Sequence, residues 1–386
     1  MLMLTPKYSA QLAADIYLVQ KPGTQELFYD AYKEDLEVDE KTNNQLSGKT
    51  GAFFLLKNTH TMGIAACGTG RFKGQAFVAL KGTSNGYDAL TDINAGIKRF
   101  HTGGAVHQGF YYTFESILPQ LQQFTQEMPN EIHTIHCVGH SLGGALATLA
   151  ADWLSYNSGK TVKLYTFGSP RVGLDHFSSN CKRRLTPGNI YRVYHRDDPV
   201  PMVPTWPFIH VPNGGVGDFQ LPTSNHSPIK SHSSATYIAS VSPNDSGLDW
   251  NAIKNRKPKQ NLERSIEAWL RSDGILSLTI NTAWIAGEAM LWVLKKIGHL
   301  AGISLVVAGS TTFTLLDRLA IFLHKAYQIS KDISFWVMRL IRRLAQLIGM
   351  TIVTGVDITV SFIRMVFLRL HRAISDLVMR AGRTIH

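Results

Sequence analysis

The sequence predicts an α/β fold with a mostly parallel central sheet, followed by an all-α C-terminal region. Three observations favour this fold class. Short apolar runs alternate with helix-like segments over residues 1–245. One of these runs leads into a glycine-flanked serine and then into a helix, which is a strand–turn–helix pattern. Beyond residue 262 the apolar spacing becomes helical and proline is absent, so the polar, basic residues 246–261 are the expected linker.

The first part of the chain is expected to contain several helices, strands and loops in succession. An amphipathic helix is expected over residues 7–19, and an acidic, solvated loop over residues 33–50. Five apolar runs have the length and composition of sheet strands: 52–56, 75–80, 132–138, 162–167 and 190–195. A long helix is expected to begin near His107 and to end at Glu127, before Pro129. His107 itself is interpreted as a structural hydrogen-bonding residue rather than a catalytic base.

The sequence GHSLG (residues 139–143) has the flanks of a nucleophile elbow, because an apolar run precedes it and a helix follows it. The turn is so sharp that the residues two before and two after the serine face each other without room for side chains. Both positions therefore require glycine. Ser141 would lie at the tip of the turn, with a strained backbone and an exposed hydroxyl. The N–H groups at the start of the helix would point to where negative charge develops, so Ser141 is predicted to be a nucleophile.

The backbone N–H groups of Thr83 and Leu142 are the candidates for an oxyanion hole. In α/β-hydrolases one donor follows an early strand and the other belongs to the residue after the nucleophile. Thr83 follows the predicted strand 75–80, and Leu142 follows Ser141. The next segment, residues 84–100, mixes glycine with leucine and isoleucine. Its composition leaves open whether it is a mobile lid or a fixed surface loop with a short helix.

Asp198 is the favoured acid of a catalytic triad. It follows the predicted strand 190–195 and directly precedes Pro199, which holds it in an extended conformation. The alternative is Asp197, which could instead cap the turn or pair with a nearby arginine. The chain order Ser–Asp–His is the order found in α/β-hydrolases.

Three histidines lie within reach of the nucleophile: His210, His226 and His232. A catalytic imidazole needs a loop long enough to reach the serine and a firm anchor that holds its angle. His232 is favoured because it lies at the start of a helix whose Tyr237 and Ile238 can anchor it against the core. The other two histidines stay open as alternatives.

Taken together, six motifs in order resemble those of the class 3 (fungal-type) lipase family over roughly residues 50–240: VALKGTSN with LTDIN, VHQGF, VGHSLGGALATLAA, YTFGSPRVG, RVYHRDDPVPMVP and HSSATYI. The resemblance implies an α/β-hydrolase fold and hydrolysis of an ester bond in a glycerolipid. The positions that it assigns to the triad and the oxyanion hole are Ser141, Asp198, His232, Thr83 and Leu142. Lys81 departs from the family, which usually has an arginine before Gly-Thr. The resemblance does not cover the C-terminal region.

Charge divides the chain into two parts. Residues 1–250 hold 20 of the 39 Lys and Arg and 20 of the 28 Asp and Glu, so the whole net charge of +11 belongs to residues 251–386. The three cysteines and the scattered histidines show neither a disulfide framework nor metal-ligand spacing, so no metal or other cofactor is expected. The first residues lack a basic segment followed by an apolar run, so no Sec-type signal peptide is expected.

The basic C-terminal region combines long apolar segments with regularly spaced arginines. Three apolar segments are each long enough to cross a bilayer: 275–294, 297–316 and 344–363. Between and after them, arginines recur three to five residues apart among Trp, Phe, Leu and Met, a pattern typical of helices that bind anionic membranes. We favour interfacial or conditional membrane binding, and a soluble helical bundle is the alternative. The heavy apolar load argues against a nucleic-acid partner.

The leading functional hypothesis is therefore a lipid-ester hydrolase of the phospholipase A type that acts at a membrane surface. A lipase without a signal peptide but with a membrane-active tail suggests a bacterial effector or toxin, exported by a specialised secretion system. A cytoplasmic or membrane-associated location is the other expectation. The alternative function is a membrane-disrupting or membrane-anchored protein in which the C-terminal helices carry the main activity.

Overall fold

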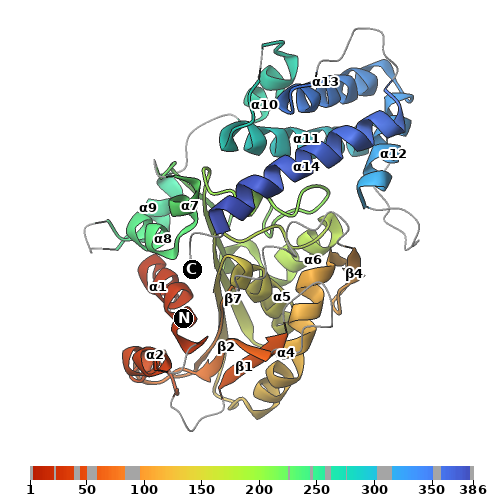
Figure 1. Ribbon diagram of the computed structural model, residues 1–386. Coiled ribbons are helices and arrows are strands. Elements are labelled where there is room, and N and C mark those ends of the chain that lie inside the picture. Colours follow the sequence, from red (N-terminus) through yellow and green to blue (C-terminus); the bar gives the residue numbers. More distant parts are fainter. Residues whose placement is uncertain are drawn as a thin grey trace.

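A seven-stranded sheet forms the centre of the computed structural model (Figure 1). The structure describes residues 3–20, 23–38, 44–49, 59–82, 96–224, 227–243, 247–256, 262–274, 276–301, 315–350 and 358–382. In the order in which they lie side by side, the strands are β1 (Gln45–Lys49), β2 (Thr59–Cys67), β3 (Gln75–Leu80), β6 (Thr134–His140), β7 (Thr161–Phe167), β8 (Ile190–His195) and β9 (Asp218–Leu221). The pairs from β3 to β9 are parallel, and the pairs among β1, β2 and β3 are antiparallel. The expected α/β fold with a mostly parallel sheet is confirmed.

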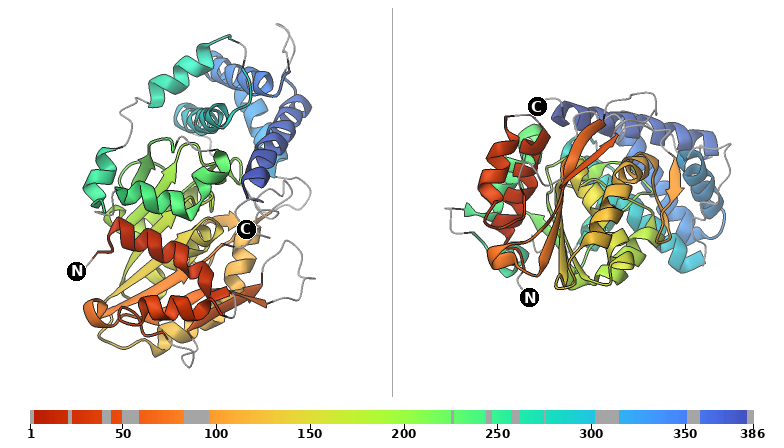
Figure 2. Two further views of the ribbon diagram at one scale, coloured as in Figure 1. Left: turned by 60° about the vertical axis from the view of Figure 1, so that its left-hand side comes forward. Right: turned by 90° about the horizontal axis from the view of Figure 1, so that it is seen from below.

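Helices cover both faces of the sheet (Figure 2). One face carries α1 (Pro6–Asp15), α2 (Gln25–Tyr32), α8 (Ser234–Val241) and α9 (Trp250–Asn255), and the other carries α4 (Gln108–Glu127), α5 (Leu142–Asn157) and α6 (Asp175–Leu185). Successive side chains of a strand point to opposite faces. Accordingly, Val78 and Leu80 of β3 belong to the core under α5, whereas Phe77 and Ala79 belong to the core under α1. Because both faces of the sheet are covered, the sequences of these strands are nearly continuous apolar runs.

Two expectations about the N-terminal part were inaccurate. The predicted solvated loop 33–50 contains the edge strand β1, which pairs with β2. The sequence QLSGK has no apolar alternation, so only the pairing partner reveals the strand. The predicted helix 7–19 is α1, and it ends at Asp15 and passes into a 3₁₀ helix η1 (Ile16–Gln20). The predicted strand 52–56 lies outside the described residues. The strand 75–80 and the helix 108–127 are confirmed.

Part of the expected linker packs on the central sheet. Trp250, the first residue of α9, is buried, and its indole N–H donates to the backbone oxygen of Leu4 at 2.8 Å. Its ring lies 4.4 Å from the ring of Tyr191 on β8. The domain boundary within 246–261 stays a prediction.

The C-terminal region consists of helices that pack on one another. They are α10 (Leu262–Arg271), α11 (Ile280–Ala301), α12 (Leu315–Tyr327), α13 (Lys331–Leu347) and α14 (Val360–Gly382), in agreement with the expected all-α region. The apolar segment 344–363 does not form one helix, because it is divided between the end of α13 and the start of α14. Within the described ranges, no helix has both the length and the hydropathy needed to cross a bilayer.

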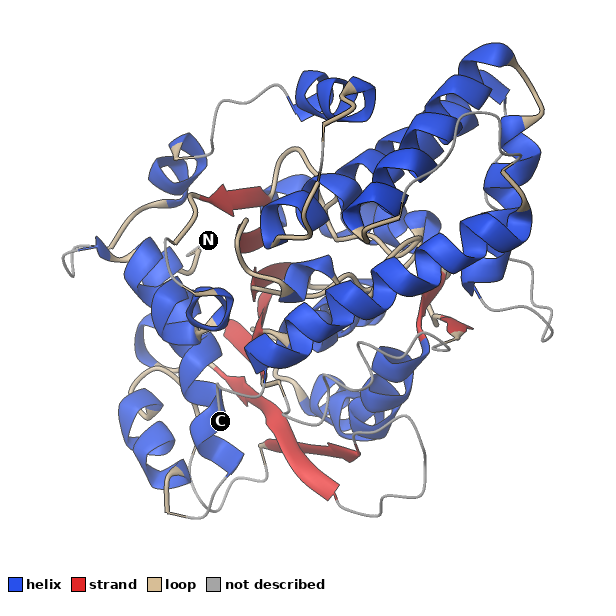
Figure 3. Ribbon diagram, turned by 45° about the horizontal axis from the view of Figure 1, so that its top comes forward, coloured by secondary structure: helices blue, strands red, loops and turns tan. Residues whose placement is uncertain are grey.

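The helical region lies against the edge of the sheet where the parallel strands end (Figure 3). The indole N–H of Trp206 donates to the backbone oxygen of Gly287 on α11 at 3.1 Å. The Thr205 hydroxyl lies 2.8 Å from Nδ1 of His371 on α14, and both side chains are buried. One apolar cluster extends from the α5 face of the sheet into these helices. The helical region therefore covers the edge that carries the candidate site.

Candidate active site

The elbow around Ser141 has the geometry that its glycines require. Ser141 joins β6 to α5 with φ 58° and ψ −133°, a left-handed conformation that a residue with a side chain rarely adopts. A Cβ atom on Gly139 would lie 2.2 Å from the backbone oxygen of Gly143. A Cβ on Gly143 would lie 2.1 Å from the backbone oxygen of Leu80. Both glycines are thus fixed by backbone atoms that cannot move aside.

The structure brings Ser141, His232 and Asp198 into one hydrogen-bonded line. Nε2 of His232 lies 2.9 Å from Oγ of Ser141, and Nδ1 lies 2.8 Å from Oδ2 of Asp198. Because a carboxylate only accepts hydrogen bonds, Nδ1 carries the proton of the neutral ring. Nε2 is then left to accept the serine proton. All three side chains are buried, which strengthens these interactions relative to water.

Two further hydrogen bonds hold the Asp198 carboxylate in place. Oδ1 accepts from the backbone N–H of Val200 at 2.9 Å, and Oδ2 accepts from the hydroxyl of Tyr237 at 2.7 Å. Burial, with the Asp198 charge adding to it, raises the pKa of Tyr237 well above its ordinary value, so the phenol stays protonated and donates. Gly168 leaves room for the carboxylate, because a Cβ atom at that residue would come 2.7 Å from Oδ2. The carboxylate therefore has one orientation, which faces His232.

Asp197, the alternative acid, serves another purpose. Its carboxylate accepts from the backbone N–H and the hydroxyl of Ser224 and from the hydroxyl of Ser231. Ser231 precedes His232 on α7 (Pro228–His232). Asp197 thus ties the segment that carries the histidine to the strand end that carries Asp198, rather than contacting the imidazole itself.

His210, one of the two other histidine candidates, is not brought to Ser141. Nε2 of His210 donates to the backbone oxygen of Pro201 at 2.9 Å, and burial lowers the pKa of His210 well below its usual range. His226 lies outside the described residues. His107 accepts from the backbone N–H of Gly109 and so caps α4, as a structural residue should.

The oxyanion candidates are described only in part. Leu142 is the first residue of α5, where backbone N–H groups have no partner within the helix. Thr83 and most of the segment 84–100 lie outside the described residues. The preceding residue Gly82 lies beside the elbow, because a Cβ atom there would be 3.5 Å from both the Leu142 nitrogen and Cβ of Ser141. These two distances leave room for a Cβ atom, and the Tyr17 hydroxyl, 2.7 Å from that position, is the atom that would have to shift.

Tyr17 enters the site from the N-terminal 3₁₀ helix, and the sequence pattern gave no sign of it. Nε2 of His140 lies 2.8 Å from the backbone oxygen of His232, so this nitrogen must carry the proton. Nδ1 of His140 then accepts from the Tyr17 hydroxyl at 3.2 Å, and the same hydroxyl accepts from the backbone N–H of Gly82 at 3.1 Å. One tyrosine therefore links the end of β3, the elbow and the histidine segment. Nothing in the helical periodicity of residues 7–19 marks this contact.

Lys81 departs from the arginine that the resemblance leads one to expect, and it is fully buried. Its ammonium donates to Oε1 of Gln20 at 2.9 Å. Burial lowers the pKa of Lys81 to about 8, because the charged form loses its hydration. The residue thus joins β3 to the N-terminal helix on the side of the sheet that carries Tyr17.

Helices of the C-terminal region contact the segments that hold the triad. Helix α14 packs on α7, and α11 packs on the 3₁₀ helix η4 (Val200–Met202) that follows Asp198. On α11, the Trp284 ring lies 4.5 Å from the Arg196 guanidinium. Desolvation raises the pKa of Glu288 on α11, while the guanidinium of Arg171 opposes the rise. The helical region therefore meets the hydrolase through apolar and charged contacts next to the site.

Part of the chain is similar in sequence to known lipases. The family model for lipase (class 3) matches residues 77–208, a range that includes the elbow and Asp198 but not His232. A secreted mono- and diacylglycerol lipase of Fusarium solani is 38% identical over 131 residues, which are 33% of this chain and 38% of that protein. Toxin TseL of Vibrio cholerae is 35% identical over 120 residues, which are 30% of this chain and 18% of the toxin. The chain spans less than two fifths of the length of these relatives.

Among solved structures, the nonglycosylated LIP2 lipase of Yarrowia lipolytica is similar with a TM-score of 0.42 and 23% sequence identity. The similarity covers 56% of this chain and 78% of that one.

Proposed function

We propose that the protein hydrolyses a carboxylic ester of a glycerolipid through an acyl-enzyme on Ser141, and we proceed from the match of residues 77–208 to the family model for lipase (class 3). The observation that carries the proposal is the hydrogen-bonded line from Asp198 through His232 to the serine hydroxyl. A serine is a weak nucleophile unless a base that is itself oriented accepts its proton. This arrangement provides both the base and its orientation.

The reaction follows from the positions of these atoms. Nε2 of His232 takes the proton of Ser141 as Oγ attacks the ester carbonyl, and Asp198 stabilises the imidazolium that forms. The N–H of Leu142, at the N-terminus of α5, donates to the oxyanion, and Thr83 is the second donor that the sequence indicates. His232 then protonates the leaving alcohol. His232 then takes a proton from water, the water attacks the acyl-enzyme ester, and the fatty acid is released from Ser141.

Release of fatty acid from defined lipids tests this function. Purified protein is incubated with mono-, di- and triacylglycerols and with phosphatidylglycerol and phosphatidylcholine, and the products are identified by mass spectrometry. We expect a free fatty acid and the corresponding deacylated lipid from at least one of these esters. A protein that hydrolyses none of them, although it is folded, would contradict the proposal.

We further propose that the substrate is a membrane phospholipid and that the protein is an exported bacterial effector. The similarity to a protein named as a toxin supports the second part, and the basic helical region supports the first. On that region, the Arg271 guanidinium lies 4.8 Å from the Trp336 ring and 5.3 Å from the Phe335 ring. Lys296 lies 4.4 Å from the Trp292 ring. Cations among aromatic rings suit the interface of an anionic bilayer.

Sedimentation with vesicles tests the membrane contact. Phe335 is 40% exposed, and replacing it with serine should weaken binding to phosphatidylglycerol vesicles about tenfold, because one aromatic side chain no longer enters the interface. Leu27→Ser is the matched control, since Leu27 on α2 is 58% exposed but lies on the hydrolase. Equal binding by the two variants would contradict this contact. Vesicle leakage that does not depend on Ser141 would instead favour the alternative, in which the helices carry the main activity.

A further inference from the structure

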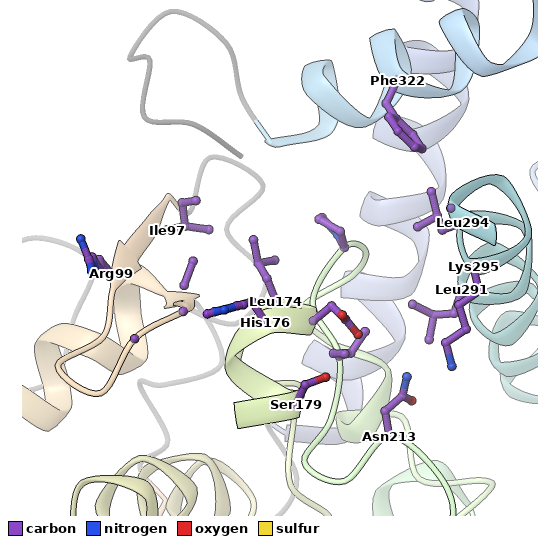
Figure 4. Close-up of a pocket in the computed structure, with 17 residues that line it drawn as sticks. Ile97, Arg99, Leu174, His176, Ser179, Asn213, Leu291, Leu294, Lys295 and Phe322 are labelled. Atoms are coloured by element: carbon purple, nitrogen blue, oxygen red, sulfur yellow. The ribbon is translucent and has the colours of Figure 1, made fainter. Parts of the chain in front are cut away.

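A pocket of about 980 Å³ lies between the hydrolase and the C-terminal helices (Figure 4). On the hydrolase side it is lined by the hairpin of β4 (Ile97–Arg99) and β5 (Ala105–His107), by the start of α6 and by residues of the 207–213 segment. Helices α11 and α12 form the opposite wall. None of the three triad residues lines it. The pocket is therefore separate from the three proposed catalytic side chains.

The walls of the pocket are mainly apolar, and they come from both parts of the chain. Leu291 and Leu294 of α11 and Phe322 of α12 face Leu174 and Ile97 of the hydrolase (Figure 4). Ligand sites of this kind have volumes of roughly 300–1,000 Å³, so the cavity lies at the upper end of that range. A long unbranched hydrocarbon chain fits such walls, because it removes apolar surface from water along its whole length.

Polar groups gather along one side of the pocket. Lys295, Asn213 and Ser179 lie on the lower side in the view of Figure 4, away from Phe322. The side chains of Lys295 and Asn213 form no ion pair or hydrogen bond with any residue in the described ranges. Lys295 and Arg99 outnumber the one lining carboxylate, Asp175, so the charge of the lining favours an anionic group.

We propose that this pocket binds one long-chain fatty acid, with its carboxylate at Lys295 and Asn213 and its chain along Leu291, Leu294 and Phe322. One lysine and one amide suit a single carboxylate, which accepts hydrogen bonds from both. The choice of a fatty acid rests on the proposed function, because ester hydrolysis at Ser141 releases that product. Since both parts of the chain form the walls, an occupied pocket would also hold the helical region on the hydrolase.

Titration of the full-length Ser141→Ala protein with oleate tests the proposal without turnover. We expect saturable binding of one oleate per chain, and weaker binding of methyl oleate, which has no charge to pair with Lys295. Lys295→Gln should weaken oleate binding about tenfold and remove the preference over the methyl ester. Lys254→Gln is the matched control, because Lys254 is exposed on α9 and does not line the pocket. It should bind oleate as the parent protein does.

A second pair of measurements tests where the hydrocarbon chain of the ligand lies and whether the ligand is a free fatty acid or a lysophospholipid. Leu294→Gln should weaken oleate and methyl oleate alike, and lysophosphatidylcholine should bind less tightly than oleate because its zwitterionic head lacks a free carboxylate. Equal effects of Lys295→Gln and Lys254→Gln, or tighter binding of lysophosphatidylcholine, would overturn the assignment. Oleate binding without lipid hydrolysis by the wild type would contradict the proposed function alone. Hydrolysis without oleate binding would contradict this inference alone.

Discussion

Replacing Ser141 with alanine is expected to lower kcat for ester hydrolysis by about 10⁶-fold, because the acyl-enzyme can no longer form. Alanine keeps the Cβ atom, so the strained turn at φ 58° is unchanged and the fold should persist. The measurement is release of fatty acid from whichever defined lipid the wild type cleaves. Residual activity should come only from the oxyanion donors and from substrate binding.

Ser155→Ala is the matched control for this variant. Ser155 lies on the same helix α5, but its hydroxyl donates to the backbone oxygen of Asp152 at 2.8 Å, far along the helix from the elbow. Its activity should equal that of the wild type. If the Ser141 variant retained wild-type hydrolysis while both variants were folded, another nucleophile would have to be sought.

Replacing Asp198 with asparagine is expected to lower kcat by about 10⁴-fold. Oδ2 accepts from both His232 and Tyr237, and Oδ1 accepts from the Val200 N–H. An amide has one oxygen and one NH₂ group, so in either orientation at least one of these donors faces another donor. If the NH₂ group faces His232, the proton moves to Nε2, and the imidazole can no longer accept from Ser141.

Asp197→Asn separates the two neighbouring carboxylates. This change removes the same charge one residue earlier, and its partners Ser224 and Ser231 are hydroxyl and backbone donors that the remaining amide oxygen can still serve in part. We expect a loss of no more than about tenfold, since the effect on His232 is indirect. A larger loss in the Asp197 variant than in the Asp198 variant would reverse the assignment of the acid.

The elbow could be predicted from the sequence because its constraints are local. A Cβ atom at Gly139 would meet the backbone of Gly143, four residues later, and the pattern GHSLG carries that requirement directly, whereas the partner of Gly143 is Leu80 on the adjacent strand β3. The helix 108–127 and the strand 190–195 were likewise predictable, since apolar periodicity and a stopping proline mark their extent. The preference for His232 over His210 rested on an expected anchor, Tyr237, which the structure places against Asp198.

Contacts between segments that are far apart in the sequence could not be predicted from a local pattern. Tyr17 bonds the backbone of Gly82 and the ring of His140, 65 and 123 residues away, and neither spacing nor composition near residue 17 shows it. The polar sequence of β1 predicts a solvated loop. Its backbone forms a strand because it pairs with β2, and the sequence near residue 47 does not show this pairing. Both depend on which segments the fold brings together.

The sequence by itself determined an α/β domain with a serine elbow, and then a basic helical region. It could do so because backbone sterics and apolar periodicity act over short distances. Only the tertiary structure decided that Asp198 and His232 lie in line with Ser141, and that α11 and α14 pack beside them. An apolar helix face shows that something must cover it, but not whether the partner is another helix, a sheet edge or a lipid. In this protein the apolar faces of the C-terminal helices are covered by one another and by the end of the sheet near Ser141, and a pocket lies between the helices and the sheet domain.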